Sequence, residues 1–484
     1  MILSSNADGK LSPVDSSIRS SLIPGQKLTA LIKALATEGP GLAIPEGKTG
    51  PVIFVPFAAA GDRVQIEITE LKKNFARGKL LSVLSPGPGR VQPACVLHFS
   101  ESRRTEACGG CNWQHLDYVT QLVQKRNLVV DTLKKIGGFQ NPHVKETLPS
   151  PQNWKYRNKV QIPFGKREGK VVCGFYASGT HHIVDFSDCP VQSEISVRIA
   201  LRVKALAQEQ NWPIYDEVSG GGWLRHLLIR SSYEGKALVA FVTRTDYFPK
   251  LRELLDSLIR EFPQIAGIHQ NIQPLKTSVI LGRKWKKLWG QESLVEKIGP
   301  FLFKVSAGSF LQVNTPAAEV LYRSAVEGLS QGGRPPLILD LYCGVGTTSL
   351  WASQVSDRVI GVEENPLAVK DAWENARLNQ VKKVRFLAGK SESVLARISR
   401  EMKEGSSVLC DPPRTGLAPH IPKALGRLPI GKIVYISCDL GTFSRDAALL
   451  CRQGFSLRSV QPVDLFPQTA HVESVGIFER KRGA

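Results

Sequence analysis

PLILDLYCGVGTTSL, residues 336–350, decides the fold of this chain. Its first apolar residues predict a buried strand that ends at Asp340. A turn with Gly344 and Gly346 follows, and glycine at such positions lets a ligand approach the backbone. Thr347 is suited to begin the next helix, whose free N–H groups would face that ligand. The stretch therefore predicts a parallel strand, a tight turn and a helix built around a bound molecule.

The next predicted strand indicates the class of the bound molecule. A dinucleotide fingerprint would have a third glycine where this chain has Ser349, which disfavours a pyrophosphate ligand. The strand Arg358–Val362 ends at Glu363, which is placed to accept hydrogen bonds from two ribose hydroxyls. An acidic strand end without that glycine favours a nucleoside cofactor such as S-adenosylmethionine.

Composition limits the partners. A chain of 484 residues should hold two to four domains, and its formal net charge of +20 favours a polyanion, most plausibly nucleic acid. A basic protein kept soluble by its charge is the alternative. We find no apolar run long enough to span a bilayer and no secretory signal, so we expect a cytoplasmic protein without membrane contact. Residues 1–22 are interpreted as a disordered leader.

Residues 23–88 predict a small β-barrel. Segments such as Pro51–Val55 and Arg63–Ile68 alternate apolar and polar residues, and glycines separate them. Its basic edge could hold RNA by shape and phosphate, although a structural barrel would have the same pattern. The basic residues are Lys72, Lys73, Arg77 and Lys79.

Cysteines mark the region 89–292, which we predict to be a central α+β domain. Cys108 and Cys111 have the spacing at which two sulfurs face one ion, and Cys95 and Cys189 could complete a four-thiolate site. Structural zinc, an iron–sulfur cluster and a redox pair all remain open, with metal ligation favoured by the two further cysteines.

The same region holds candidate RNA contacts. Residues 112–138 predict an amphipathic helix that packs on the C-terminal domain. The run Trp154–Lys159 mixes aromatic and basic residues, which fits stacking and phosphate contact with single-stranded RNA through Arg157 and Lys159. An exposed basic strand is nearly as good an interpretation.

Alternating strands and helices over 293–484 predict a doubly wound parallel sheet, whose ligands lie at the carboxyl ends of its strands. Cys438 ends one such strand, where a thiolate could add to carbon 6 of uracil and make carbon 5 nucleophilic toward a methyl donor. Glu473 follows another predicted strand and could then remove the carbon-5 proton. The adjacent Asp439 carboxylate is expected to raise the pKa of Cys438. Arg414 follows Asp411-Pro412-Pro413 and supplies no stacking ring, which argues against methylation of an exocyclic amine.

Here the chain resembles the RNA uracil-5 methyltransferases, with a first barrel like the TRAM module of several members. The matching motifs are Cys108–Cys111, Ser309–Asn314, Asp340–Gly346, Asn375–Asn379, Asp411–Arg414, Ser437-Cys438 with Arg445-Asp446, and Phe466–Glu473.

The resemblance implies an S-adenosylmethionine-dependent enzyme with a Rossmann-like C-terminal domain, the nucleophile Cys438 and the base Glu473. It also implies a 4Fe-4S cluster on Cys95, Cys108, Cys111 and Cys189. Expected cofactor contacts are Gln312, Tyr342, Gly344, Thr347, Glu363 and Asp411, and expected RNA contacts are Phe310, Arg157 and Lys159.

A TRAM module together with a cluster is similar to the branch that modifies large-subunit ribosomal RNA, so 23S RNA is the expected substrate of a monomeric enzyme. Transfer RNA is the alternative substrate. A non-catalytic RNA-binding factor would need neither Cys438 nor Glu473. A cytosine-5 methyltransferase would place its cysteines in other motifs.

Overall fold

The computed structural model describes residues 22–46, 50–103 and 106–481, so most of the predicted leader lies outside the described residues. The chain forms two compact units. The first comprises the described residues up to Ala107 together with Cys111–Thr120, and the second comprises Cys108–Gly110 and the described residues from Gln121 onward. Within the described ranges, no helix combines the length and the apolar character that crossing a membrane requires.

The first unit contains the predicted barrel. Five strands close in the order β1-β2-β3-β5-β4, and their inward residues, such as Ile53 and Ile66, are fully buried. Asp62 stabilises the linker that follows β5. Its carboxylate accepts hydrogen bonds from the backbone N–H of Gly87 and from the Arg90 guanidinium. The strands are β1 (Lys27–Leu35), β2 (Gly41–Pro45), β3 (Val52–Val55), β4 (Arg63–Leu71) and β5 (Phe75–Ser85).

The second unit begins with helix α1 (Tyr118–Lys135), whose first three residues still belong to the first unit. The predicted helix 112–138 starts later, because the side chains of Asn112 and Trp113 donate hydrogen bonds to the backbone carbonyls of Glu38 and Gly39. It ends before two glycines, of which Gly138 has a left-handed φ of +73°.

A seven-stranded sheet follows in the order β12-β11-β10-β9-β6-β7-β8. It belongs to the same compact unit as the C-terminal sheet, so the boundary near residue 292 stays a prediction. Its elements are β6 (Lys159–Arg167), β7 (Lys170–Tyr176), β8 (Ile183–Asp185), α2 (Glu194–Glu209), β9 (Leu224–Ser231), β10 (Ala237–Thr243), α3 (Leu251–Glu261), β11 (Ile265–Ile272) and β12 (Lys284–Gly290).

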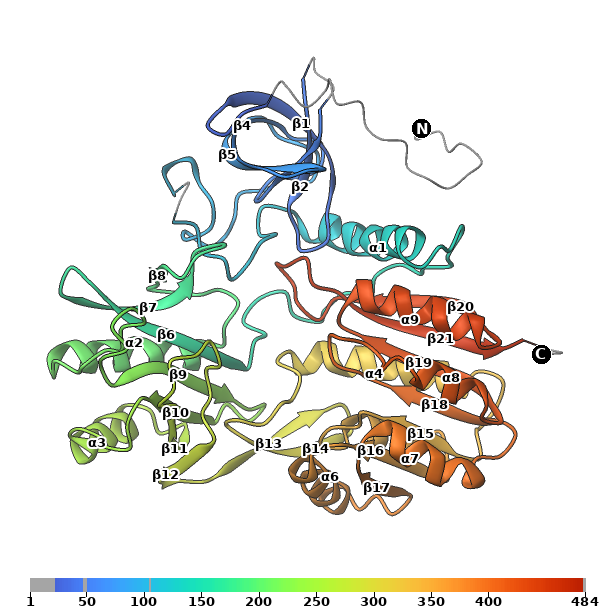
Figure 1. Ribbon diagram of the computed structural model, residues 1–484. Helices are drawn as coiled ribbons and strands as arrows, with labels where there is room; N and C mark the ends of the chain where they lie inside the picture. Colours follow the sequence, from blue (N-terminus) through green and yellow to red (C-terminus); the bar gives the residue numbers. More distant parts are fainter. Residues whose placement is uncertain (1–21, 47–49, 104–105, 482–484) are drawn as a thin grey trace. The chain divides into compact units, whose positions relative to one another are not determined.

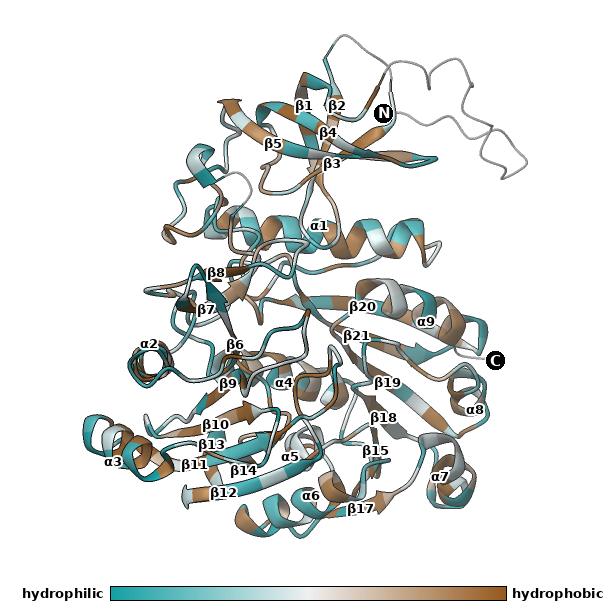
Figure 2. Cartoon of the chain, turned by 60° about the vertical axis from the view of Figure 1, so that its left-hand side comes forward, coloured by the Kyte–Doolittle hydropathy of each residue, from teal (hydrophilic) through white to brown (hydrophobic). Residues whose placement is uncertain are grey.

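The C-terminal sheet confirms the predicted doubly wound fold. Its order is β17-β16-β15-β18-β19-β21-β20, with β15 to β19 parallel and β21 antiparallel to both of its neighbours. Helices cover both faces: α4 to α6 lie on one side and α7 to α9 on the other (Figures 1 and 2). The strands are β15 (Ile338–Leu341), β16 (Val359–Glu363), β17 (Val384–Ala388), β18 (Ser406–Cys410), β19 (Ile430–Ser437), β20 (Phe455–Val463) and β21 (Glu473–Arg480). The helices are α4 (Thr315–Ser330), α5 (Thr347–Ala352), α6 (Pro366–Leu378), α7 (Ser391–Ile398), α8 (Ile421–Gly426) and α9 (Leu440–Arg452).

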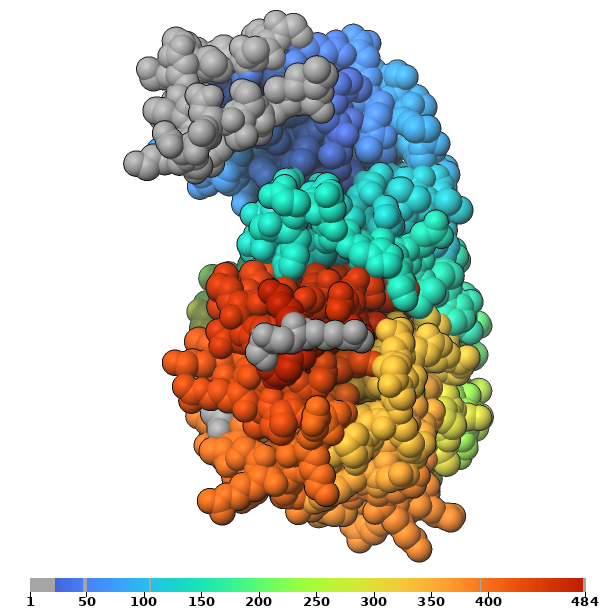
Figure 3. Space-filling view, turned by 90° about the vertical axis from the view of Figure 1, so that its right-hand side faces the viewer, coloured from blue at the N-terminus to red at the C-terminus, as the bar shows by residue number. Residues whose placement is uncertain are grey.

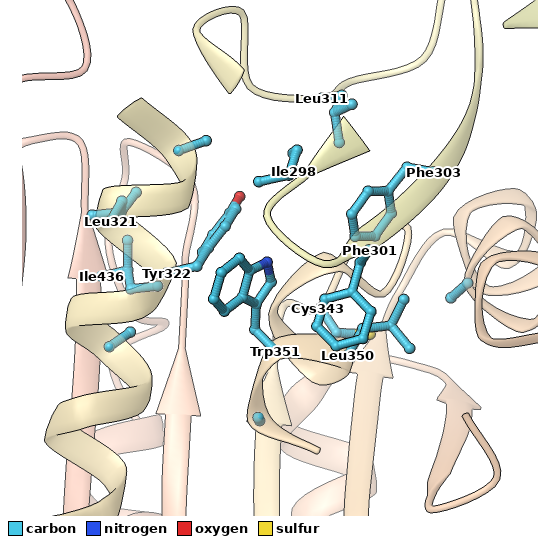
Figure 4. Packing of buried hydrophobic residues seen from close by; sticks show 14 of the residues in the cluster. Ile298, Phe301, Phe303, Leu311, Leu321, Tyr322, Cys343, Leu350, Trp351 and Ile436 are labelled. Atoms are coloured by element: carbon cyan, nitrogen blue, oxygen red, sulfur yellow. The ribbon is translucent and has the colours of Figure 1, made fainter. Parts of the chain in front are cut away.

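One hydrophobic cluster joins this sheet to the hairpin β13 (Ser293–Ile298) and β14 (Phe301–Ser306). The Trp351 ring of α5 lies 5.8 Å from that of Phe301 and 6.0 Å from that of Tyr322 on α4, measured between centroids. Figure 4 shows these rings between the hairpin and the two helices. In Figure 3 the yellow segment that includes α4 lies against the orange and red C-terminal residues, and α4 contacts β19 and β21.

Candidate active site

The carboxyl edge of the C-terminal sheet gathers the predicted motifs. Asp340 lies at this edge on β15, fully buried, and its Oδ2 accepts hydrogen bonds from the hydroxyls of Thr348 (2.7 Å) and Ser349 (2.5 Å). Its Oδ1 has no hydrogen-bond partner among the described residues. A buried acceptor without a partner is costly, so this atom fits a site completed by a ligand.

The glycine turn after β15 leaves room for that ligand. Gly344 has a φ of +53°, and a Cβ placed there would meet no atom within 4 Å. Glu363, at the end of β16, accepts hydrogen bonds from the N–H groups of Gly344 (3.2 Å) and Asn365 (2.9 Å). The carboxylate is thereby fixed at the turn and keeps capacity to accept from ribose hydroxyls. These features fit a nucleoside cofactor.

The other predicted cofactor contacts near this turn are Gln312, Tyr342 and Thr347. Tyr342 adopts a left-handed φ of +66°, which is strained for a bulky residue and turns the chain away from β15. Thr347 begins α5 and is buried. Gln312 is buried beside α4, where it hydrogen-bonds with Tyr322.

Strand pairing brings the predicted nucleophile and base together. In the antiparallel ladder of β19 and β21, Ser437 is opposite Ser474. One step further toward this edge, Cys438 and Glu473 are therefore direct cross-strand neighbours. Cys438 is half-buried and directly follows β19, and Glu473 is 3% exposed and is the first residue of β21.

The charges around this pair oppose ionisation. Burial, then the Glu473 carboxylate, then that of Asp411 raise the pKa of Cys438 to about 11, while the Arg414 guanidinium acts in the opposite sense. Burial and Asp411 raise the pKa of Glu473 to about 8, again against Arg414. Burial, followed by the charge of Asp340, raises the pKa of Asp411 to about 7. A positive ligand would favour the ionised form of all these groups.

The sequence predicts that the Asp439 carboxylate raises the pKa of Cys438, but in the structure two other carboxylates have this effect. Glu473 and Asp411 are the carboxylates that raise the pKa of Cys438. Asp439 instead caps α9, where its side chain accepts hydrogen bonds from the N–H (2.8 Å) and hydroxyl (3.0 Å) of Thr442. This cap places Cys438 just before a helix N-terminus, which favours an anion.

Helix α1 holds the loop that leads to Glu473. The fully buried Lys125 forms an ion pair of 2.5 Å with Asp464 and donates to the carbonyl of Phe466 (3.1 Å). The amide side chain of Gln121 donates to Gln468 (3.0 Å) and accepts from its backbone N–H (2.9 Å). The motif that ends at Glu473 therefore depends on contacts from residues more than 300 positions earlier.

The three predicted RNA contacts lie in different settings. Phe310 is 74% exposed. Lys159 is half-buried, and its Nζ donates to the carbonyls of Gly308 (3.2 Å) and Ser309 (3.0 Å), so it supports the Phe310 loop from within. Burial, then the charge of Arg230, lowers its pKa to about 7. The pKa of His471, in the loop before Glu473, is lowered by burial and then by the charges of Arg414, Lys125 and Arg157. Arg157 therefore lies near this loop. The RNA contacts themselves stay predictions.

Tyr322 is the residue of this site that the sequence did not reveal. It is buried on α4, and burial, followed by the charges of Asp411, Glu473 and Asp340, raises its pKa. Its hydroxyl thus lies among the carboxyl groups of the site. Within the apolar stripe of an amphipathic helix, it has the pattern of a core residue.

The predicted four-cysteine site is not confirmed. Across the described ranges, no group of three or more His, Cys, Asp and Glu side chains is arranged to hold a metal ion. Cys95 and Cys111 belong to the first compact unit, whereas Cys108 and Cys189 belong to the second. The Cys108 Sγ accepts a long hydrogen bond from the N–H of Gly110 (3.4 Å).

Comparison with known proteins identifies the family. A family profile described as tRNA (Uracil-5-)-methyltransferase matches residues 269–482, and one described as the TRAM domain matches residues 23–81. A protein of Halalkalibacterium halodurans named as an uncharacterized RNA methyltransferase is 36% identical over 451 residues, which is 93% of this chain and 96% of that protein. The chain belongs to the RNA uracil-5-methyltransferase family.

Two further relatives agree with this assignment. An uncharacterized RNA methyltransferase of Clostridium tetani is 37% identical over 92% of this chain and 94% of its own length. The solved structure of the Pyrococcus abyssi tRNA (uracil-54, C5)-methyltransferase, a complex with S-adenosyl-L-homocysteine, has a TM-score of 0.72 at 27% identity. It covers 93% of this chain and 100% of that one. The chain is thus an S-adenosylmethionine-dependent RNA methyltransferase with a TRAM domain.

Proposed function

We propose that this methyltransferase modifies carbon 5 of a specific uridine through a covalent adduct between Cys438 and carbon 6. The pairing of Ser437 with Ser474 carries the proposal, because it makes the thiol and a buried carboxyl neighbours. A binding protein would need neither group at the cofactor edge of its sheet.

Cys438 begins the reaction. Its thiolate adds to carbon 6 of uracil, and the electron pair of the 5,6 double bond moves into an enolate that makes carbon 5 nucleophilic. S-adenosylmethionine, when bound, supplies the electrophilic methyl group that carbon 5 takes. Glu473 then accepts the carbon-5 proton, the double bond re-forms, and the Cys438 thiolate leaves.

Six residues are proposed to hold the cofactor at this edge. The fixed Glu363 carboxylate suits the ribose hydroxyls, and the open space at Gly344 suits close approach of the ligand to the backbone. Asp411 lies close enough to Cys438 and Glu473 for its charge to act on both, and so suits a positively charged part of the ligand. Gln312, Tyr342 and Thr347 complete the proposed set.

Two substitutions test the covalent mechanism. Cys438→Ala should bind RNA and cofactor but form no adduct and transfer no methyl group. Glu473→Gln should add Cys438 and methylate carbon 5 but stall before elimination, so a protein–RNA complex should accumulate on a denaturing gel. Cys451→Ala, which changes a half-buried cysteine of α9, is the matched control and should behave as the wild type. Methylation by Cys438→Ala without any adduct in the wild type would refute this mechanism.

The proposed substrate is 23S ribosomal RNA, as the combination of a TRAM domain with four cysteines suggests. Transfer RNA is the second candidate, because the Pyrococcus abyssi relative is named as a tRNA enzyme. Mass spectrometry of both RNA classes from cells lacking the protein separates them, since 5-methyluridine should disappear from one class only. Unchanged 5-methyluridine in both would contradict the proposed reaction.

A 4Fe-4S cluster on Cys95, Cys108, Cys111 and Cys189 is proposed as a structural group, supported by the spacing of Cys108 and Cys111 and by the family resemblance. Anaerobically purified protein should be brown and contain about four irons per chain. Colourless protein with one zinc would refute the cluster. We also propose a cytoplasmic monomer, which light scattering and cell fractionation would test.

A further inference from the structure

Strand β12 is an exposed sheet edge whose sequence, KWKKLWG, alternates basic and aromatic residues. It pairs with β11 on one side only, and Figure 2 shows it as a largely hydrophilic strand at the outer edge of its sheet. Trp285 and Trp289 are 38% and 36% exposed. Large aromatic rings that stay in contact with solvent on a charged strand suit a partner that offers both flat faces and negative charge.

The pairing register separates the two tryptophans. Trp285 is opposite Asn271, whereas Trp289 is opposite Ile268 after a bulge. Because successive residues point to opposite faces, these two rings lie on opposite faces of the sheet. The Trp285 face is the one directed at the loop after β14: a Cβ on Gly308 would come within 2.8 Å of the Trp285 ring.

That loop presents Phe310 on a firm support. The hydroxyls of Ser306 and Ser309 hydrogen-bond to each other (2.7 Å), and both Lys159 and Arg230 donate to the carbonyl of Ser309. Phe310, the next residue, is 74% exposed. Two residues further on, Gln312 reaches Tyr322 among the carboxyl groups of the candidate site.

We propose that Trp285, beside the loop that carries the expected RNA contact Phe310, forms a stacking platform for an unpaired base of the RNA that flanks the target uridine. This inference rests on the proposed function and extends it by a binding surface. Every base has a π-face, so such a surface holds a single strand with little sequence preference.

The charges along β12, which lie on both faces of the sheet, favour the same partner. Arg283, Lys284, Lys286 and Lys287 are exposed. Lys284 and Lys286 share Asp246, and Lys287 is 3.4 Å from Glu292. Four cations against two carboxylates leave a net charge of +2 along this edge, which suits a phosphate backbone.

The test measures binding of a short, fluorescently labelled oligouridylate to the full-length protein. Trp285→Ala should weaken binding roughly 5- to 100-fold, as for loss of one stacked base, without changing the salt dependence. Trp285→Leu, which still fills the space beside Gly308 but has no ring, should lose as much. Trp289→Ala is the matched control on the opposite face and should bind within about twofold of the wild type. Affinity for S-adenosylmethionine should stay unchanged in all three.

The outcomes are distinct. If the wild type binds the oligonucleotide and both Trp285 variants bind equally well, the stacking platform is refuted while the proposed function stands. If the wild type does not bind the oligonucleotide, the stacking platform is refuted, while the proposed function is tested separately by the Cys438 and Glu473 variants. If light scattering instead shows a wild-type dimer that Trp285→Ala dissociates, the edge pairs with a second copy of the chain, and the proposal is overturned.

Discussion

Raising the pH from about 6 to about 8 should weaken the contribution that three neighbouring carboxyl groups make to the stability of the cofactor-free protein, because these groups ionise late. Burial raises the pKa of Asp340 and Asp411 to about 7 and that of Glu473 to about 8. In the unfolded chain the same groups lose their protons near pH 4. At these three groups the folded state therefore holds protons that the unfolded state has released, and their contribution to stability falls as the pH rises through this range.

The size of the effect follows from these pKa values. A carboxyl with a folded pKa of about 7 loses about 1 kcal/mol of the free energy of unfolding between pH 6 and 8, and one at about 8 loses about 2 kcal/mol. Glu473→Gln removes the larger contribution and should flatten the pH dependence by about that amount. Asp357→Asn is the control, because ion pairing with Arg334 lowers the pKa of Asp357 and keeps its titration below this range.

Urea denaturation at several pH values measures these changes, with the free energy of unfolding extrapolated to water. S-adenosylmethionine carries a positive sulfonium and should restore more stability at pH 8 than at pH 6, whereas neutral-sulfur S-adenosylhomocysteine should show less of this difference. A Glu473→Gln variant with the wild-type slope would refute the assignment of a raised pKa to this carboxyl group. Lys159, whose lowered pKa of about 7 acts in the opposite sense, is common to both proteins and cancels from this comparison.

Three further predictions concern other parts of the molecule. Lys125→Met should lower the free energy of unfolding, measured by urea denaturation, by about 3–5 kcal/mol, because it leaves the buried Asp464 carboxylate uncompensated. A double variant that also carries Asp464→Leu should recover much of this loss. No recovery would contradict the ion-pair argument. Gly346→Ala should destabilise the protein by at least about 1 kcal/mol by the same assay and weaken cofactor binding, since its φ is +86° and the new Cβ would lie 2.9 Å from the Phe386 ring. Lys73→Ala, on the barrel edge, should reduce the slope of log affinity for RNA against log salt by about 1, and an unchanged slope would leave the barrel a structural role.

Much of the fold and of the candidate site follows from local sequence pattern. The strand ending at Asp340, the glycine turn and the acidic end of the next strand were predicted where the structure has them, because apolar runs and glycines report local geometry directly. The prediction that Cys438 ends a strand agrees with its place directly after β19, whereas Glu473, predicted to follow a strand, is the first residue of β21. The antiparallel direction of β21, which makes them neighbours, is a property of strand order that periodicity does not encode.

What the sequence did not reveal depends on distant contacts. Lys159 belonged to a basic run that favours RNA, yet its ammonium group supports a loop about 150 residues away. Tyr322 had the pattern of a core residue, and only the fold brings carboxyl groups around it. The proposed role of Trp285 depends on the position of its ring beside Gly308, which lies on a different segment. In each case the partner lies far along the chain, where composition and spacing carry no information.

The placement of β21 between β19 and β20 also makes the active site depend on strand register. β20 and β21 are consecutive antiparallel strands, and Glu473 stands beside Cys438 only when β21 pairs with β19 in the observed register. A one-residue slip of β21 would direct Glu473 to the opposite face of the sheet. Such a slip would leave the thiol without its base while most of the backbone hydrogen bonds of the sheet could still form. The capacity to complete a turnover therefore depends on a single register.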